Sequence, residues 1–152
     1  FVHETIGFNF SFTEMQAAIG LSQLDKLQKI IEIKKNIYQK YCDAFVNHEH
    51  ICLPDNIENI DSVMWMSYFF FENRSELEDY LSSKKIQSRK FFYPLHLQPC
   101  YKEFPSLRKD SNYQTSLSLY EYGLCLPSSV LMTEKQQDMV IKEVLEFYSR
   151  VQ

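Results

Sequence analysis

An apolar stripe at helical spacing runs through the first third of the chain and constrains the fold more than any other feature. It begins at Thr13, where Thr13 and Gln16 have the spacing of a capping box, a reciprocal pair of hydrogen bonds that starts a helix. No glycine or proline interrupts the chain between Gly20 and Val46. The stripe consists of Met15, Ala18, Ile19, Leu27, Ile30, Ile31, Ile37, Tyr38, Tyr41 and Phe45. The pattern predicts one helix from Thr13 to about Val46, roughly 50 Å long at 1.5 Å per residue. Such a helix would link two bodies.

The overall composition is that of a globular protein that does not bind nucleic acid or membranes. Hydrophobic residues make up 45% of the 152 residues, and the net charge is -4, so no basic surface is expected to attract phosphate backbones or anionic lipid. No apolar run is long enough to span a bilayer, and the first residues lack the basic and apolar regions of a secretory signal. We therefore expect a cytoplasmic protein.

The cysteines and histidines do not have the spacing of a metal site. Cys42, Cys52, Cys100 and Cys125 include no CxxC pair and have no paired histidines nearby. Four cysteines could form disulfides in a secreted protein, but a reduced, cytoplasmic domain is the preferred interpretation. His48 and His50 are interpreted as solvated loop residues. No metal is expected.

Short strands and helices follow the leading helix. Strands are expected at residues 51–53, 62–72, 86–93 and 124–127, and helices at 75–85, at 111–123 and from Thr133, where Thr133 and Gln136 form a second capping box. Because the 62–72 run is almost continuously apolar, we expect it to be buried on both faces. The last helix should place Met139, Val140, Val144, Leu145 and Tyr148 on its inner side. The fold class is α/β (α+β): a long leading helix, then a small mixed or antiparallel sheet with helices.

Only a few polar residues stand out as candidates for chemistry. Asn9 precedes the first helix and is either a turn residue or an anion contact at the helix start. Arg89 lies on an aromatic strand and is either a solvated outer-face residue or an anion clamp. His96 lies in a proline-rich connection, residues 94–105, where a lone histidine is either structural or part of a site. With only 3 glycines, the chain has no phosphate-binding glycine loop, and no nucleophile and base form a set.

Three ordered segments resemble one enzyme family. GFNFSFTEMQAAIGLSQLDKL, residues 7–27, resembles the segment in which glycine, aromatic and asparagine residues precede a QAAIG helix in the DegT/DnrJ/EryC1/StrS sugar aminotransferases. IQSRKFFYPLHLQPCYKEFP, residues 86–105, is similar to a later signature of that family. LCLPSSVLMTEKQQDMVIKEVLEF, residues 124–147, is similar to its terminal segment. Together the matches cover nearly the whole chain.

The resemblance implies a fold-type-I enzyme that uses pyridoxal phosphate and acts as a homodimer. This chain matches only the C-terminal portion: residues 1–12 would be an interface and active-site loop, 13–47 a linking helix and 48–152 the C-terminal small α/β domain. The large domain would supply the Schiff-base lysine, so we expect no catalytic residue in this segment and no activity from it alone. The chain would then be a fragment, a split-gene product or a remnant.

The resemblance also assigns residues one position at a time. Asn9 matches an asparagine that reaches the cofactor phosphate in the partner subunit. Arg89, Tyr93 and His96 match positions at the mouth where the sugar nucleotide enters, and His3 lies in the variable approach to the motif. Ser11 stands where the family usually has arginine, and that replacement removes a charge-assisted hydrogen bond of about 1.5–3 kcal/mol.

The implied reaction moves an amine from glutamate, through the cofactor, to a 4-keto-6-deoxy sugar nucleotide for surface polysaccharide biosynthesis. A sugar dehydratase of the same family, which also depends on the cofactor, is the first alternative. A non-catalytic module that dimerises through the aromatic surface and the long helix is the second.

Overall fold

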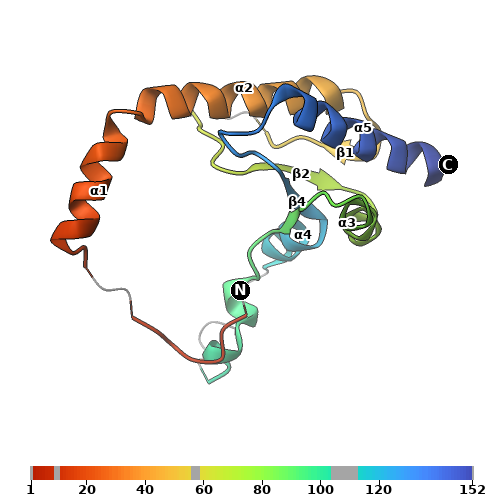
Figure 1. The fold of residues 1–152 in the computed structure, drawn as a ribbon. Helices are drawn as coiled ribbons and strands as arrows, with labels where there is room; N and C mark the ends of the chain where they lie inside the picture. Colours follow the sequence, from red (N-terminus) through yellow and green to blue (C-terminus); the bar gives the residue numbers. More distant parts are fainter. Residues whose placement is uncertain (1, 9–10, 56–58, 104–112, 152) are drawn as a thin grey trace.

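The computed structural model describes residues 2–8, 11–55, 59–103 and 113–151 (Figure 1). Along the chain these residues form α1 (Glu14–Leu24), α2 (Leu27–Phe45), β1 (Ile51–Cys52), β2 (Ser67–Phe71), α3 (Arg74–Ser83), β3 (Arg89–Lys90), the 3₁₀ turns η1 (Leu95–Leu97) and η2 (Pro99–Tyr101), α4 (Gln114–Tyr122), β4 (Gly123–Leu126) and α5 (Glu134–Val151). The mixed fold class predicted from the sequence is confirmed.

The four strands form one antiparallel sheet in the order β1-β2-β4-β3. Three strands are shorter than predicted: β1 ends at Cys52 instead of residue 53, β2 begins at Ser67 instead of residue 62, and β3 contains only Arg89 and Lys90. Ser67 pairs with Leu126, the last residue of β4, and Pro127 follows. Because proline has no backbone N–H to donate, the ladder ends there and the residues before Ser67 have no strand to pair with.

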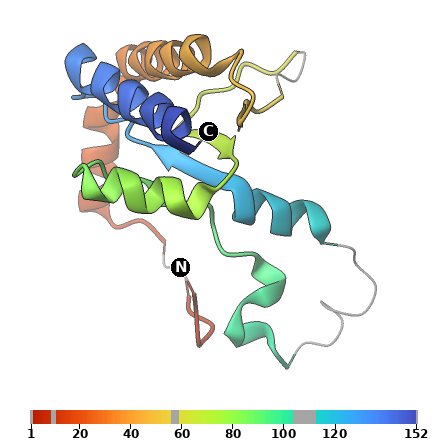
Figure 2. The same ribbon diagram turned by 90° about the vertical axis from the view of Figure 1, so that its right-hand side faces the viewer.

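The hydrophobic core lies on one face of this sheet, beneath α2, α3 and α5 (Figures 1 and 2). Along β2 the burial alternates: Ser67, Phe69 and Phe71 are buried, whereas Tyr68 and Phe70 are half-buried. Burial of β2 on both faces is therefore only partly correct. The half-buried face contacts the ring of Phe91, and α4 packs against the same sheet. Full burial of a Phe or Leu side chain contributes about 1.5–3 kcal/mol, which makes the α2/α3/α5 face the main source of stability.

The prediction of a single helix from Thr13 to about Val46 is wrong, because the chain turns at Asp25 and Lys26 (Figure 1). The Lys26 N–H donates to the Gln23 carbonyl oxygen at 3.0 Å, a short-range bond that tightens the last turn of α1. Beyond the turn, α2 follows the sheet and buries Ile37, Tyr41 and Phe45. The apolar residues therefore keep one helical period throughout the sequence, but only those of α2 pack against the hydrophobic core.

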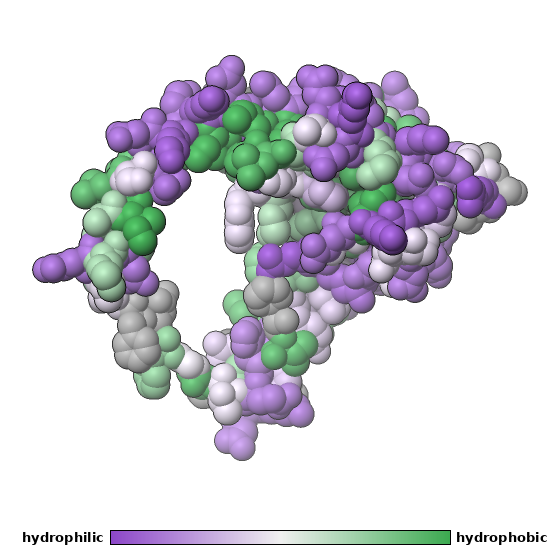
Figure 3. All heavy atoms as spheres, viewed as in Figure 1, coloured by the Kyte–Doolittle hydropathy of each residue, from purple (hydrophilic) through white to green (hydrophobic). Residues whose placement is uncertain are grey.

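Helix α1 has the predicted capping box and no buried residue. The Gln16 N–H donates to the Thr13 hydroxyl at 3.3 Å, and the Thr13 N–H donates to the Gln16 side-chain oxygen at 2.8 Å. Its apolar side chains face solvent: Met15 is 78% exposed and Ile19 64%. In Figure 3, hydrophobic side chains gather over α1, beside an opening between this helix and the rest of the molecule. The apolar stripe of α1 is thus uncovered in this chain.

The last helix confirms most of its predicted pattern. The capping box of Thr133 and Gln136 is present, and Val140, Val144 and Tyr148 are buried. Met139 is the exception: it is 49% exposed and does not belong to the inner side. No helix within the described ranges is both long and apolar enough to cross a membrane.

Gly123 is the residue at which α4 ends and β4 begins. Its backbone is extended, with φ of -75°, instead of left-handed. A Cβ added at this position would lie 2.4 Å from the Leu119 carbonyl oxygen and 2.7 Å from Cγ of Phe91. Glycine is required here because α4 and Phe91 leave no room for a side chain.

Candidate functional site

The N-terminal segment is attached to the proline-rich connection that follows β3. The Gln98 side-chain oxygen accepts the His3 N–H at 2.8 Å, and the Cys100 N–H donates to the His3 carbonyl oxygen at 3.0 Å. Gln98 is only 3% exposed, although its side chain is a polar amide. A buried amide needs hydrogen-bond partners, so Gln98 fixes where residues 2–8 run. Two segments that are far apart in the sequence are therefore held side by side.

The connection itself has a defined shape. Pro94 and Pro99 restrict the backbone at the starts of η1 and η2, and each turn is closed by a backbone hydrogen bond of 3.0 to 3.1 Å. The His96 ring stacks on the Tyr113 ring with centroids 4.3 Å apart. Tyr93 meets Tyr120 of α4 edge to face at 5.4 Å. Tyr93 thus contacts α4, and the connection that follows it contacts Tyr113, the residue just before α4.

Arg89 lies on edge strand β3, next to a cavity of about 350 Å³ at the end of the sheet. Its guanidinium lies 5.3 Å from the centroid of the Phe92 ring, a cation–π distance. It pairs in register with Cys125 of β4. Burial raises the pKa of the Cys125 thiol, and the positive charge of Arg89 opposes that rise. Both residues line the cavity.

A lysine that the sequence did not single out is hydrogen-bonded to Ser128, one of the residues that line this cavity. The ammonium of Lys34, on α2, donates to the carbonyl oxygens of Trp65, at 2.8 Å, and Ser128. Burial lowers the pKa of Lys34. One side chain thus joins α2 to the segment that enters β2 and to the segment that leaves β4. Nothing in the local sequence around Lys34 indicates this role, because both of its partners are backbone atoms.

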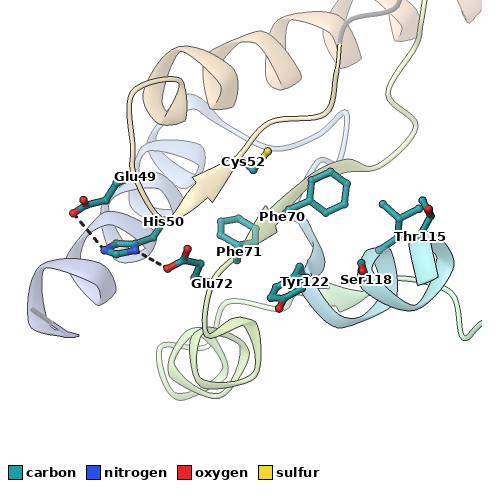
Figure 4. Close-up of a pocket in the computed structure, with 10 residues that line it drawn as sticks. Glu49, His50, Cys52, Phe70, Phe71, Glu72, Thr115, Ser118 and Tyr122 are labelled. Carbon is teal, nitrogen blue, oxygen red and sulfur yellow. Dashed lines mark hydrogen bonds and ion pairs between the residues drawn. The ribbon is translucent and has the colours of Figure 1, made fainter.

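A second cavity, of about 370 Å³, lies between β1, β2 and α4 (Figure 4). Phe70 and Tyr122 line its apolar part, and His50 and Glu72 stand at one end, where His50 Nδ1 lies 2.8 Å from a Glu72 carboxylate oxygen. The His50 ring also stacks on Tyr148 at 5.3 Å, so it is not merely a solvated loop residue. Among the residues that the structure describes, none of those predicted as site residues lines this cavity.

The structure brings some of the predicted site residues together and leaves the others apart. His3, Tyr93 and His96 belong to the joined N-terminal segment and connection, and Arg89 stands a few residues upstream beside its cavity. Ser11 is exposed, immediately before α1, and Asn9 lies outside the described residues. The sequence missed Gln98, Lys34, Tyr113 and Tyr120 as organising residues. Of these four residues only Gln98 has a local signal in the sequence, because it is a glutamine in a segment bounded by Pro94 and Pro99.

Comparison with known proteins identifies the family. The sequence profile of the DegT/DnrJ/EryC1/StrS aminotransferase family matches residues 1–145. The chain belongs to this family. A GDP-perosamine synthase of Escherichia coli O157:H7 is 30% identical over 153 residues, covering 97% of this chain and 39% of that protein. A protein of Bacillus subtilis described as the putative pyridoxal phosphate-dependent aminotransferase EpsN is 25% identical, again with 39% of its length covered.

The fold agrees with this family membership. The crystal structure of S. venezuelae DesV in complex with a ketimine intermediate matches with a TM-score of 0.83 and 26% identity, covering 95% of this chain and 39% of that one. This is a family of pyridoxal phosphate-dependent aminotransferases, and the sugar aminotransferases that the chain matches have fold type I. This chain spans about two fifths of the relatives that it matches.

Lys34 is not available to carry the family's cofactor. Covalent attachment needs a lysine whose amine is accessible, and Lys34, whose pKa burial lowers, already donates to two backbone carbonyls. Residues 2–8, 11–55, 59–103 and 113–151 also contain no group of three or more His, Cys, Asp or Glu side chains that could hold a metal ion.

Proposed function

We propose that this chain is the C-terminal part of a nucleotide-sugar aminotransferase that depends on pyridoxal phosphate. Its substrate would be a 4-keto-6-deoxy sugar nucleotide used for surface polysaccharide biosynthesis, and glutamate would donate the amine. The family match and the names of the relatives, GDP-perosamine synthase among them, support this substrate class. The cofactor, when bound, accepts and then releases the amino group. The enzyme would be cytoplasmic.

One observation in this chain carries the proposal. The bond between His3 and Gln98 draws together two segments that separately match the family, the one leading to Asn9 and the one containing Tyr93 and His96. A site that uses both segments requires each of them to have a fixed position. Buried Gln98 fixes the first segment, and the ring contacts of Tyr93 and His96 fix the second. Asn9 would contact the cofactor phosphate in the partner subunit. Arg89, Tyr93, His96 and Ser11 would contact the sugar nucleotide.

A homodimer is part of the proposal. The apolar side chains of α1 and of the preceding loop are exposed, with Phe8 at 86% and Phe12 at 85%. Contiguous exposed apolar surface marks a place where another protein surface packs. The large domain and the partner subunit would cover it. The same surface also supports a second candidate, a non-catalytic module that uses α1 only for association.

The cofactor contacts can be tested in two steps. The 152-residue chain, mixed with pyridoxal phosphate, is expected to show no stoichiometric absorbance band that depends on one lysine. In the full-length protein, Asn9→Ala is expected to weaken retention of the cofactor, whereas Asn36→Ala, an exposed position on α2, should leave it unchanged. Equal retention in both variants would remove Asn9 from the site. A lysine-dependent band in the chain alone would contradict the division of labour between the domains.

A further inference from the structure

One stripe of α4 lines the cavity of about 370 Å³ that lies between β1, β2 and α4 (Figure 4). Thr115, Ser118, Leu119 and Tyr122 recur at the three- and four-residue spacing that places side chains on one face of a helix. Helix α4 buries none of its residues, although it packs against β2 and β4. Leu119 and Tyr122 are accordingly 38% and 44% exposed. The space between this helix and the sheet has the volume of a small-molecule site.

The wall opposite α4 is largely apolar. Phe70 of β2 is half-buried and pairs in register with Cys52 of β1, so both side chains lie on the same face of the sheet. Figure 4 shows the rings of Phe70 and Tyr122 between the α4 hydroxyls on one side and His50 with its carboxylate neighbours on the other. Aromatic rings pack on apolar groups, and their faces also attract cations.

The charged end of the cavity is acidic. Glu49 and Glu72 both line it, and no lysine or arginine is found among the described residues of its lining. His50 lies between the two carboxylates, with Nδ1 2.8 Å from Glu72 and Nε2 3.4 Å from Glu49. A protonated imidazole carries one positive charge, against two carboxylates. The charged side chains of the lining are therefore negative on balance.

A buried tyrosine beside this end experiences the same sign of charge. The Tyr148 ring stacks on the His50 ring with centroids 5.3 Å apart. Burial raises the pKa of Tyr148, and the negative charges of Glu72 and Glu76 raise it further. Opposite charges attract and like charges repel, so an anionic ligand is disfavoured here and a cationic one is favoured.

We propose that this cavity binds a small organic cation with an apolar body, an arylalkylamine being the simplest case. The carboxylates would pair with the ammonium group, and the rings of Phe70 and Tyr122 would pack on the body. The α4 hydroxyls would bind a polar group at the other end of a longer ligand. None of the described residues assigned to the sugar nucleotide lines the cavity, so the proposal does not depend on the proposed function.

Three probes with the same ring test the recognition of charge. Phenethylamine, phenethyl alcohol and hydrocinnamate are cationic, neutral and anionic at neutral pH. Each is titrated into the isotope-labelled 152-residue chain while its amide chemical shifts are followed by NMR. We expect saturable shifts in β1, β2 and α4 with the amine, at least about threefold weaker binding of the alcohol and about tenfold weaker binding of the carboxylate. Butylamine, a cation without the ring, should also bind at least about threefold more weakly than phenethylamine.

Matched variants test the carboxylates and the aromatic ring. The double variant Glu49→Gln, Glu72→Gln should bind phenethylamine about tenfold more weakly than the parent chain does. The control Glu4→Gln, Glu32→Gln removes the same charge at two exposed positions and should leave the affinity unchanged. Tyr122→Leu should weaken the amine about two- to fivefold and Tyr122→Phe should not, because only phenylalanine keeps the ring. Circular dichroism of each variant confirms that it is folded.

The proposal is wrong if phenethylamine and phenethyl alcohol bind equally well, because charge is then not recognised. Equal losses of affinity in the two double variants would remove the carboxylates from the site. The same affinity in Tyr122→Leu and Tyr122→Phe would remove the contact of the cation with the ring. If millimolar amine causes no saturable shifts, or only shifts far from β1, β2 and α4, this cavity is not a ligand site.

Discussion

The buried side chain of Gln98 accepts a hydrogen bond from the backbone of His3 at 2.8 Å, across 95 positions of sequence. The Cys100 N–H donates back to the His3 carbonyl oxygen. The loop that leads to Asn9 and the connection that contains His96 are therefore positioned relative to each other within this chain alone. Any site that uses both of them depends on Gln98.

Replacing Gln98 by leucine should release the N-terminal segment without unfolding the domain. The variant keeps the side-chain volume but removes the acceptor of the His3 N–H. Because a net hydrogen bond contributes about 0.5–1.5 kcal/mol, amide exchange in residues 2–8 should rise by roughly two- to tenfold. Hydrogen exchange followed by mass spectrometry measures this. Gln39→Leu, at an exposed position of α2, serves as the control, and equal exchange in the two variants would contradict the role of Gln98.

Gly123→Ala should destabilise the domain by about 1–3 kcal/mol, because the added methyl group meets the Leu119 carbonyl oxygen and the Phe91 ring. The midpoint of urea unfolding measures the change. Gly20→Ala is the matched control: it lies inside α1, and its added methyl group has nothing within 4 Å. If both variants unfold at the parent midpoint, the packing described around Gly123 is wrong.

Ser67→Ala should leave the free energy of unfolding unchanged or raise it by up to about 1 kcal/mol. The Ser67 hydroxyl is fully buried and finds no hydrogen-bond partner among the described residues. Removing a polar group that forms no bond recovers its cost of burial. Thr133→Ala, which deletes the hydroxyl of a capping box, should instead cost about 1 kcal/mol. A clear loss of stability in Ser67→Ala would mean that the hydroxyl is bonded in solution.

His48 should make the domain less stable in mild acid. Burial lowers the pKa of His48, the charge of His50 lowers it further, and Glu49 opposes the change. The His50 N–H also donates to Nδ1 of His48 at 3.4 Å, which requires that nitrogen to be unprotonated. The folded state therefore binds fewer protons than the unfolded state, and stability falls as pH drops from about 6.5 through the folded pKa.

Urea unfolding of the parent and of His48→Gln between about pH 7.5 and pH 5 tests the effect of His48. The variant should lose less stability than the parent over this range. Parallel losses in both proteins would show that other groups cause the acid sensitivity.

Local rules predicted much of the fold. Both capping boxes, at Thr13 and Thr133, follow from side chains three residues apart, and the strand at Ser67–Phe71 follows from its dense aromatic content. These signals are local, so one sequence is sufficient to find them. The break at Asp25 and Lys26 is not predicted, because the period of the stripe is the same on both sides and only the position of the core distinguishes them.

The candidate site was predicted less completely than the fold. Arg89 and His96 stood out in the sequence itself, and Tyr93 was named from a resemblance. Tyr120 and Tyr113, which contact Tyr93 and His96, were not predicted, since those contacts join segments with no shared period. Lys34 could not be predicted either, because its two acceptors are backbone oxygens that only the folded chain brings together. Asn9 remains a prediction.

The central claim is that this chain completes a sugar aminotransferase and does not catalyse the reaction alone. The direct measurement is the formation of 2-oxoglutarate from glutamate in the presence of a 4-keto-6-deoxy sugar nucleotide. It is made with the 152-residue chain and with the protein encoded by its whole reading frame. We predict product that depends on the sugar nucleotide from the whole protein and none from the chain alone. Turnover by the chain alone, or no amine transfer by a whole protein that retains pyridoxal phosphate, would contradict the claim.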